Sequence, residues 1–175
     1  MFDKQLVGIL YNKVGLLSPG KIGLVNHMFG VSIVAGFLAR KLLDADISVN
    51  VGMAETAAAI HDIGKVFDEG SPEHIIKGVE FLREQGIDEG IIRIVERHEV
   101  YSFKENETPP DPATWEEKLV FLADLSFSGN IVPIEERVED IISRYPGIRK
   151  KWLREKSQEI YSKILAIVSP QTLPF

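Results

Sequence analysis

The sequence predicts an all-α fold. Apolar residues recur at the three- and four-residue spacing of a helix along almost the whole chain, and no long segment alternates apolar and polar residues as a β-strand does. Proline, glycine and serine residues divide this pattern into segments of helical length. The 175 residues are 45% hydrophobic, which suffices for one sizeable buried core. We therefore expect residues 1–175 to form a single helical domain.

The first two predicted helices meet at a proline. The apolar pattern runs through residues 3–17 until Ser18 and Pro19 interrupt it. Because proline is tolerated in the first turn of a helix, this pair also opens a second helix, which continues to about Leu43. Residues 22–39 of that helix carry no charge and reach the length of a membrane span. They also contain an asparagine, a histidine and three glycines, so we interpret them as a helix in a protein core.

The central helices are bounded by polar and glycine-rich connections. Polar residues 44–50 lead to an Ala-rich helix over residues 51–63, for which Gly64 is the expected C-terminal cap. A Ser-Pro-Glu sequence then predicts the N-terminus of a helix over residues 71–85, which a glycine ends. A further helix is expected over residues 89–98.

A long loop separates these helices from the last three. Residues 99–114 are polar and contain three prolines, which exclude a regular element. Loops of this length are often functional, and this one is a candidate cover for a neighbouring site. Helices are then predicted over residues 115–126, 133–145 and 148–168. The last helix has apolar residues that could pack on the domain or on a second copy, so a homodimer stays open.

Composition excludes several classes of function. A net charge of -6 opposes non-specific binding of nucleic acid, so we expect no nucleic-acid partner. The N-terminus lacks the charged region of a signal peptide, from which we expect a cytoplasmic protein without a membrane partner. No cysteine is present, so a metal site must use carboxylates and the four histidines.

Histidines and an aspartate fall on faces that the apolar pattern places inside the protein. His98 follows apolar residues at helical spacing, and His27 and His61 lie among glycines and alanines. Asp124 interrupts a strongly apolar run, where an unpaired carboxylate is costly. A single inward histidine is usually a hydrogen-bonded core residue, and an inward aspartate is usually a cap or a partner of arginine. Together on four helices, these residues favour a metal site.

Two more residues extend this candidate site. Asp62 follows His61 directly, and His74 lies in a first helical turn, where the helix dipole keeps an imidazole neutral. Neutral imidazoles and carboxylates suit Fe, Mn, Zn, Ni or Co, and suit Mg less as the share of histidine rises.

These residues, in this order, resemble the HD superfamily of metal-dependent phosphohydrolases, helical bundles named for a His, His-Asp, Asp pattern. Here the pattern is His27, His61 with Asp62, and Asp124, and the central segment reads His-Asp-Ile-Gly-Lys. The resemblance covers residues 20–140, which implies an HD-domain core on which the C-terminal helices pack.

The resemblance also implies roles for the site residues. His74 and His98 match the extra ligands of members that bind two divalent metal ions. One ion would take His27, His61, Asp62 and Asp124, while the second would take His74 and His98, with Asp62 bridging. Water activated by the metals would attack phosphorus, and Lys65 would neutralise the developing phosphoryl charge. The catalytic residues implied are thus Asp62 and Lys65.

Within the superfamily, residues 118–124 resemble bacterial di-iron hydrolases of diadenosine tetraphosphate, which places iron first among the metals. The segments after His98 and after Asp124 depart from that group, so the substrate is expected only to be a small phosphorylated molecule of the nucleotide kind. Arg97 and Arg137 are candidates for phosphate contact, because arginine binds phosphate bidentately.

We therefore predict a phosphohydrolase that cleaves a phosphate ester or anhydride of a nucleotide-like small molecule. Two alternatives stay open. Some superfamily members with the same six ligands use mixed-valence di-iron to activate oxygen, and others keep the HD fold as a signalling or binding module without turnover. Retention of all six ligands and Lys65 argues against the module.

Overall fold

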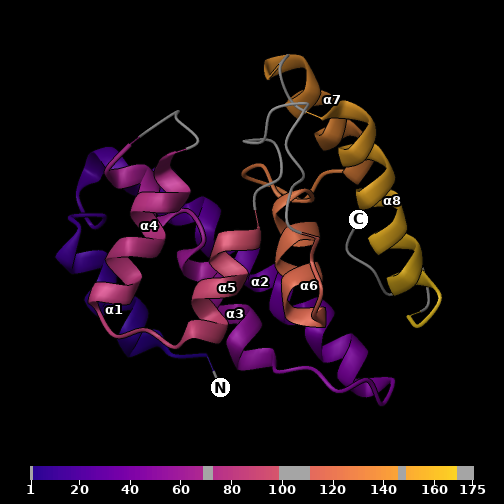
Figure 1. The fold of residues 1–175 in the computed structure, drawn as a ribbon, viewed down its shortest axis with the longest axis horizontal. Helices are drawn as coiled ribbons and strands as arrows, with labels where there is room; N and C mark the ends of the chain where they lie inside the picture. The colour runs from indigo at the N-terminus through magenta and orange to yellow at the C-terminus, as the bar shows by residue number, and fades with distance from the viewer. Residues whose placement is uncertain (1, 69–72, 99–110, 146–148, 169–175) are drawn as a thin grey trace.

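The structure is a computed structural model that describes residues 2–68, 73–98, 111–145 and 149–168. In these ranges the chain is helical, and the only β-pairing is an isolated bridge between Phe127 and Ile131. The all-α prediction is confirmed (Figure 1). The α-helices are α1 (Lys4–Lys13), α2 (Ile22–Asp44), α3 (Val51–Ile60), α4 (Glu73–Glu84), α5 (Glu89–Arg97), α6 (Trp115–Asp124), α7 (Ile134–Arg144) and α8 (Lys150–Leu165), and the 3-10 helices are η1 (Pro19–Lys21) and η2 (Ile63–Val66).

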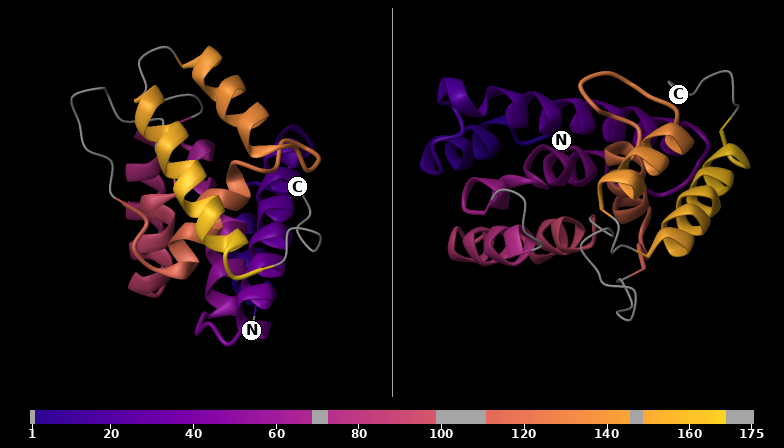
Figure 2. Two further views of the ribbon diagram at one scale, coloured as in Figure 1. Left: turned by 90° about the vertical axis from the view of Figure 1, so that its right-hand side faces the viewer. Right: turned by 90° about the horizontal axis from the view of Figure 1, so that it is seen from above.

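The helices pack in layers around α3. Helix α2 runs along one side, α3 lies next to it, and α4 with α5 forms the opposite side (Figure 2, right). Helix α6 contacts α2, α3 and α5, so it closes one end of these layers. Helices α7 and α8 pack on each other beside α6 (Figure 1). The helices that carry the predicted ligands are therefore neighbours.

Glycines in the left-handed conformation end two helices. Helix α1 stops at Lys13, earlier than the predicted residue 17, because Gly15 adopts a φ of +69°. The Leu16 N–H then donates to the Tyr11 carbonyl at 2.9 Å, which closes the helix end. Gly86, with a φ of +70°, ends the segment after α4 in the same way, as the sequence predicted.

Gly64 is not the predicted cap of α3. Helix α3 ends at Ile60, and Gly64 lies inside the 3-10 helix η2. A Cβ atom at Gly64 would lie 1.8 Å from the carbonyl oxygen of His74. The glycine is required because α4 approaches the backbone of η2 this closely, and the approach brings His74 to the end of α3.

The hydrophobic core has two clusters that meet near the predicted ligands. One cluster joins much of α2 and α3 to α6, α7 and α8, and the other joins the N-terminal part of α2 to α1, α4 and α5. Along α2, the boundary between the two clusters lies between Met28 and Val31. Along α3, it lies between Ala58 and Ala59. His27 and His61 therefore stand at the boundary between the clusters.

Helix α2 is also the one described helix that is long and apolar enough to cross a membrane. That property concerns length and composition only, and 56% of its apolar window is buried inside the bundle. Several of its apolar side chains, including Ile22 and Ile33, are exposed.

Candidate metal centre

Six side chains from six elements converge between the layers. Each is a predicted ligand, and most stand at the end of a helix, where the backbone turns toward the interior. The buried alanines of α3 let its neighbours approach closely enough for the side chains to meet. The residues are His27 in α2, His61 at the C-terminal cap of α3, Asp62 at the N-terminal cap of η2, His74 in α4, His98 at the C-terminal cap of α5, and Asp124 as the last residue of α6.

Asp62 lies at the centre of the cluster, and its two carboxylate oxygens face different histidines. Oδ1 lies 3.6 Å from Nε2 of His74 and 3.6 Å from Nε2 of His98. Oδ2 lies 3.4 Å from Nε2 of His61 and 3.6 Å from Nε2 of His27. These atoms form two groups that could each hold a metal ion, and Asp62 is common to both.

Asp124 belongs to the side of the cluster that contains His27. Its Oδ1 lies 3.0 Å from Nε2 of His27 and 3.7 Å from Nε2 of His61. Two histidines and two carboxylates therefore face one another on this side, while two histidines face Asp62 on the other.

The ring orientations of two histidines suit metal ligands. Nδ1 of His61 lies 2.7 Å from the Ala58 carbonyl, and Nδ1 of His98 lies 2.5 Å from the Val95 carbonyl. A carbonyl oxygen only accepts, so each Nδ1 carries the proton and donates it. In the neutral rings Nε2 then presents a lone pair to the cluster, the arrangement found in metal-binding histidines.

Buried atoms without hydrogen-bond partners test whether the site fits a metal. Nε2 of His61, Nε2 of His98 and Oδ1 of Asp62 are buried and accept no hydrogen bond from the described residues. Three buried acceptors without hydrogen bonds lower the stability of the folded state, and here the three atoms face one another. A divalent cation satisfies all three, so the donor set fits a metal.

The two aspartates carry negative charge at neutral pH. Burial raises the pKa of Asp62, but the interactions of its carboxylate with His61 and with the ammonium of Lys65 outweigh that effect and hold the pKa well below its usual value. Burial likewise raises the pKa of Asp124, but the interactions of its carboxylate with His27 outweigh that effect and hold the pKa below its usual value. Two buried carboxylates in one cluster favour binding of positive charge.

Lys65 lies against the same cluster. Its Nζ is 2.5 Å from Oδ2 of Asp62, and a quarter of its side chain is exposed. His27 is 20% exposed, whereas the other predicted ligands are at most 5% exposed. The cluster therefore reaches solvent beside His27 and Lys65.

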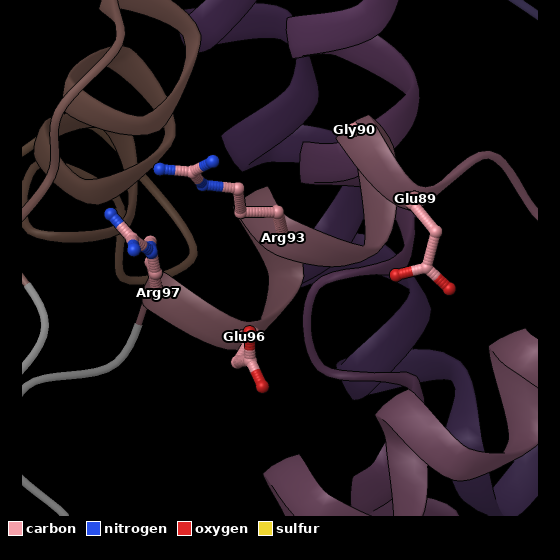
Figure 3. A pocket seen from close by; sticks show the side chains of 5 residues that line it. All are labelled: Glu89, Gly90, Arg93, Glu96 and Arg97. Atoms are coloured by element: carbon pink, nitrogen blue, oxygen red, sulfur yellow. The ribbon is translucent and has the colours of Figure 1, made fainter.

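The two predicted phosphate contacts pair with other carboxylates. Arg97 Nη1 lies 3.3 Å from Oε2 of Glu117, and Arg137 Nη1 lies 2.8 Å from Oδ2 of Asp140. Figure 3 shows Arg97 and Arg93 extending to the same side of α5, on the rim of a shallow hollow. Their contact with phosphate stays a prediction. The loop over residues 99–114, predicted to cover the site, falls largely outside the described residues.

The sequence analysis missed two residues beside the site. Glu117 is buried and accepts hydrogen bonds from Arg97 and from the Ala113 N–H, but its place in an acidic first helical turn suggests an exposed residue. The Phe127 ring lies against His27, with 6.3 Å between ring centroids. In the sequence, only the position of Phe127 three residues after Asp124 could have suggested that it lies near the site.

Comparison with known proteins identifies relatives with the same pattern. The HD domain family model matches residues 24–126, a range that includes all six predicted ligands. Among curated proteins, the uncharacterized protein MJ0778 of Methanocaldococcus jannaschii is 34% identical over 139 residues, which cover 72% of this chain and 82% of that protein.

Two further relatives are much longer than the matched region. The tRNA (cytidine(56)-2'-O)-methyltransferase of Thermoplasma volcanium is 32% identical over 78% of this chain, but the match spans 39% of the enzyme. Ribonuclease Y of Thermosipho melanesiensis is 33% identical over 69% of this chain, and the match spans 21% of that enzyme.

A solved structure has the same fold. The HD domain of the L. monocytogenes phosphodiesterase PgpH superposes with a TM-score of 0.57 at 18% identity, covering 90% of this chain and 95% of that domain. The same domain in complex with cyclic-di-AMP gives a TM-score of 0.54. These relatives support the HD superfamily, but they do not support the narrower resemblance to di-iron diadenosine tetraphosphate hydrolases.

Proposed function

Because this chain belongs to the HD domain family, we propose that it is a metal-dependent phosphohydrolase acting on a phosphate ester or anhydride of a nucleotide-like molecule. The observation that carries this proposal is the convergence of buried, unsatisfied acceptors on Asp62. A role as metal ligands accounts for that convergence. In a core with only a structural role, such buried polar atoms would have hydrogen-bond partners or would be replaced by apolar groups.

Two divalent cations fit the division of the cluster. His27, His61, Asp62 and Asp124 would hold one, and His74 with His98 would hold the other, with one oxygen of Asp62 directed to each. Iron is our first candidate, followed by Mn, Ni, Co and Zn, with Mg less favoured by the four imidazoles.

When bound, such cations polarise a phosphoryl group and lower the pKa of water. The chain's own residues prepare this chemistry. The carbonyls of Ala58 and Val95 fix the tautomers of His61 and His98, so no rotation is needed to present Nε2. Lys65, at the solvent-facing edge, places an ammonium where an anionic substrate enters and stabilises negative charge on its phosphoryl oxygens.

The comparisons favour hydrolysis of a nucleotide phosphodiester over the alternatives. The similar proteins include enzymes named ribonuclease Y and a phosphodiesterase domain solved with cyclic-di-AMP. No observation favours oxygen activation or a module without turnover. Because of these relatives, RNA is included among the substrates to be tested, although the net negative charge of this chain opposes binding of long nucleic acids.

The test is hydrolysis by the full chain, loaded anaerobically with Fe²⁺ or Mn²⁺. The panel contains bis(p-nitrophenyl) phosphate, a cyclic dinucleotide, a dinucleoside tetraphosphate and a short single-stranded RNA. We expect cleavage of at least one nucleotide substrate and its loss in the His61→Ala variant. Full activity is expected in Glu139→Ala, which alters an exposed carboxylate on α7 that pairs with Arg154. Activity that survives in His61→Ala, or inactivity on every substrate, would contradict the proposal.

A further inference from the structure

An aromatic ring stands at the point where the cluster reaches solvent. Phe127 follows α6 by three residues and lies against His27, with ring centroids 6.3 Å apart and the rings tilted by 38°. His27 is the most exposed of the six candidate ligands. Phe127 is itself only partly buried. The ring therefore borders the opening through which a substrate reaches the cluster.

A glycine of α2 allows the Phe127 ring to pack directly on the helix backbone. Gly30 lies one turn after His27 in α2, and a Cβ atom there would be 2.1 Å from two atoms of the Phe127 ring. Without a side chain at residue 30, the ring rests directly on the helix backbone. Van der Waals contact with the backbone and with His27 leaves the ring little freedom to move.

The turn that carries Phe127 is also fixed. The Ser128 N–H donates to the Asn130 carbonyl at 2.9 Å, and the Val132 N–H donates to the Ser126 carbonyl at 3.0 Å. Gly129 permits this tight turn with a φ of +81°. The ring is thus held between the end of α6, which supplies Asp124, and the helix that supplies His27.

We propose that Phe127 is the platform on which the base of a nucleotide substrate stacks while its phosphate occupies the metal cluster. This inference rests on the proposed function and names the base as a part of the substrate that the chain recognises. Stacking on an aromatic ring tolerates any base, because every base has a π-face. A rigid ring loses little conformational entropy on binding, which suits a role in recognition.

The proposal explains why a large aromatic side chain occupies a partly exposed position beside a charged cluster. A residue needed only to fill the core would be buried, as Phe121 is on the same segment. The ring also stands next to the phosphate site and not far out on the surface, so it suits a base joined to its phosphate through one sugar. A substrate without a base has no partner for it.

The test compares ligands with and without a base on the full, Mn²⁺-loaded chain. AMP and ribose 5-phosphate share the sugar and phosphate, and calorimetry gives the affinity for each. We expect Phe127→Leu, which keeps apolar bulk but loses the ring, to weaken AMP binding about 5- to 150-fold and to leave ribose 5-phosphate binding unchanged. Phe127→Tyr should retain the wild-type affinity for AMP.

Two further variants separate ring position from folding. Gly30→Ala displaces the ring without altering a ligand of the cluster, so it should weaken AMP binding selectively. Phe29→Ala removes a partly exposed ring from the same helix, one that contacts Phe2 and Tyr11, and should change neither affinity. The metal content of each variant is also measured. If Gly30→Ala or Phe29→Ala lowers the metal content, the test rests on the comparison of Phe127→Tyr with Phe127→Leu.

The outcomes distinguish this inference from the proposed function. Equal AMP affinity in wild type and Phe127→Leu, with phosphodiester hydrolysis intact, overturns the stacking platform alone. A base preference that depends on Phe127 supports the platform even if the chain hydrolyses no member of the substrate panel, which overturns the proposed function alone. A wild-type chain that binds neither ligand but hydrolyses the panel overturns the platform alone, and one that neither binds nor hydrolyses contradicts both proposals.

Discussion

Lys65 Nζ lies 2.5 Å from Oδ2 of Asp62, the carboxylate oxygen that also faces His27 and His61. The ammonium and a metal ion would thus share one oxygen. Since like charges repel at such short range, Lys65 opposes metal binding there unless it turns toward substrate. We therefore propose that Lys65 acts on the substrate and not in the retention of metal.

The Lys65→Met variant tests that assignment. We expect kcat to fall about 10²- to 10³-fold, the usual loss when one donor to developing charge is removed. Metal content should be unchanged or higher, because a competing cation is gone. Lys77→Met is the matched control, since Lys77 pairs with Asp68 at 2.8 Å. Loss of metal from Lys65→Met would show that the lysine supports the metal site instead.

Removal of metal should destabilise the chain. Without cations, Oδ1 of Asp62 and the Nε2 atoms of His61 and His98 are buried without hydrogen-bond partners among the described residues. A ligand present at 100 times its Kd stabilises the folded state by about 2.7 kcal/mol, so Tm should fall by about 5–10 °C after chelation. Thermal unfolding with EDTA and with Mn²⁺ restored measures this. The shift should shrink in Asp62→Asn; an unchanged Tm in wild type would argue against a bound metal.

Gly64→Ala should disturb both packing and the site. A Cβ at residue 64 meets the His74 carbonyl oxygen at 1.8 Å, so α4 must move away from η2. We expect a loss of about 1–3 kcal/mol in the free energy of unfolding, as for other overpacked positions, with reduced metal content because His74 moves. The control is Gly23→Ala, where a Cβ meets nothing within 4 Å. Equal stability of the two variants would refute the close approach.

Much of this architecture could be predicted from the sequence because helices and buried faces repeat with a regular period. The ends of helices could not, because they depend on local backbone bonds. Gly15 ends α1 early, and Gly64 serves packing where a cap was expected. The apolar pattern predicted inward positions for four candidate ligands, whereas Asp62 and His74 were added from their places in the chain. The structure brings all six side chains together.

Other features depend on tertiary contacts that periodicity does not encode. Glu117 stands in a first helical turn, where acidic residues are commonly exposed, yet packing of α5 on α6 buries it beside Arg93 and Arg97. Phe127 follows α6 in a short turn, and only the folded chain places its ring against His27. Periodicity also gives no sign that Asp62 is shared between two pairs of histidines; the resemblance to the HD superfamily implied it, and the structure groups the side chains in that way.

The buried Glu117 should stabilise the junction of α5 and α6. Its carboxylate accepts from the Ala113 N–H at 2.6 Å and pairs with Arg93 at 3.0 Å. We expect Glu117→Ala to lose about 1–3 kcal/mol, because a backbone donor is left without its acceptor. Arg93→Ala should lose less than about 1 kcal/mol, since half of that arginine side chain is exposed. Urea unfolding compares them, and equal losses would mean that Glu117 acts only through the ion pair.

The most direct test of the account is the metal content of protein purified without chelator, measured in parallel for wild type, His74→Ala and His98→Ala. A cluster divided by Asp62 predicts close to two metal ions per wild-type chain and close to one in each variant. Lys77→Met, on the same helix as His74, should keep the wild-type value. One metal ion per wild-type chain, unchanged in both histidine variants, would contradict the shared role of Asp62 and restrict the site to His27, His61, Asp62 and Asp124.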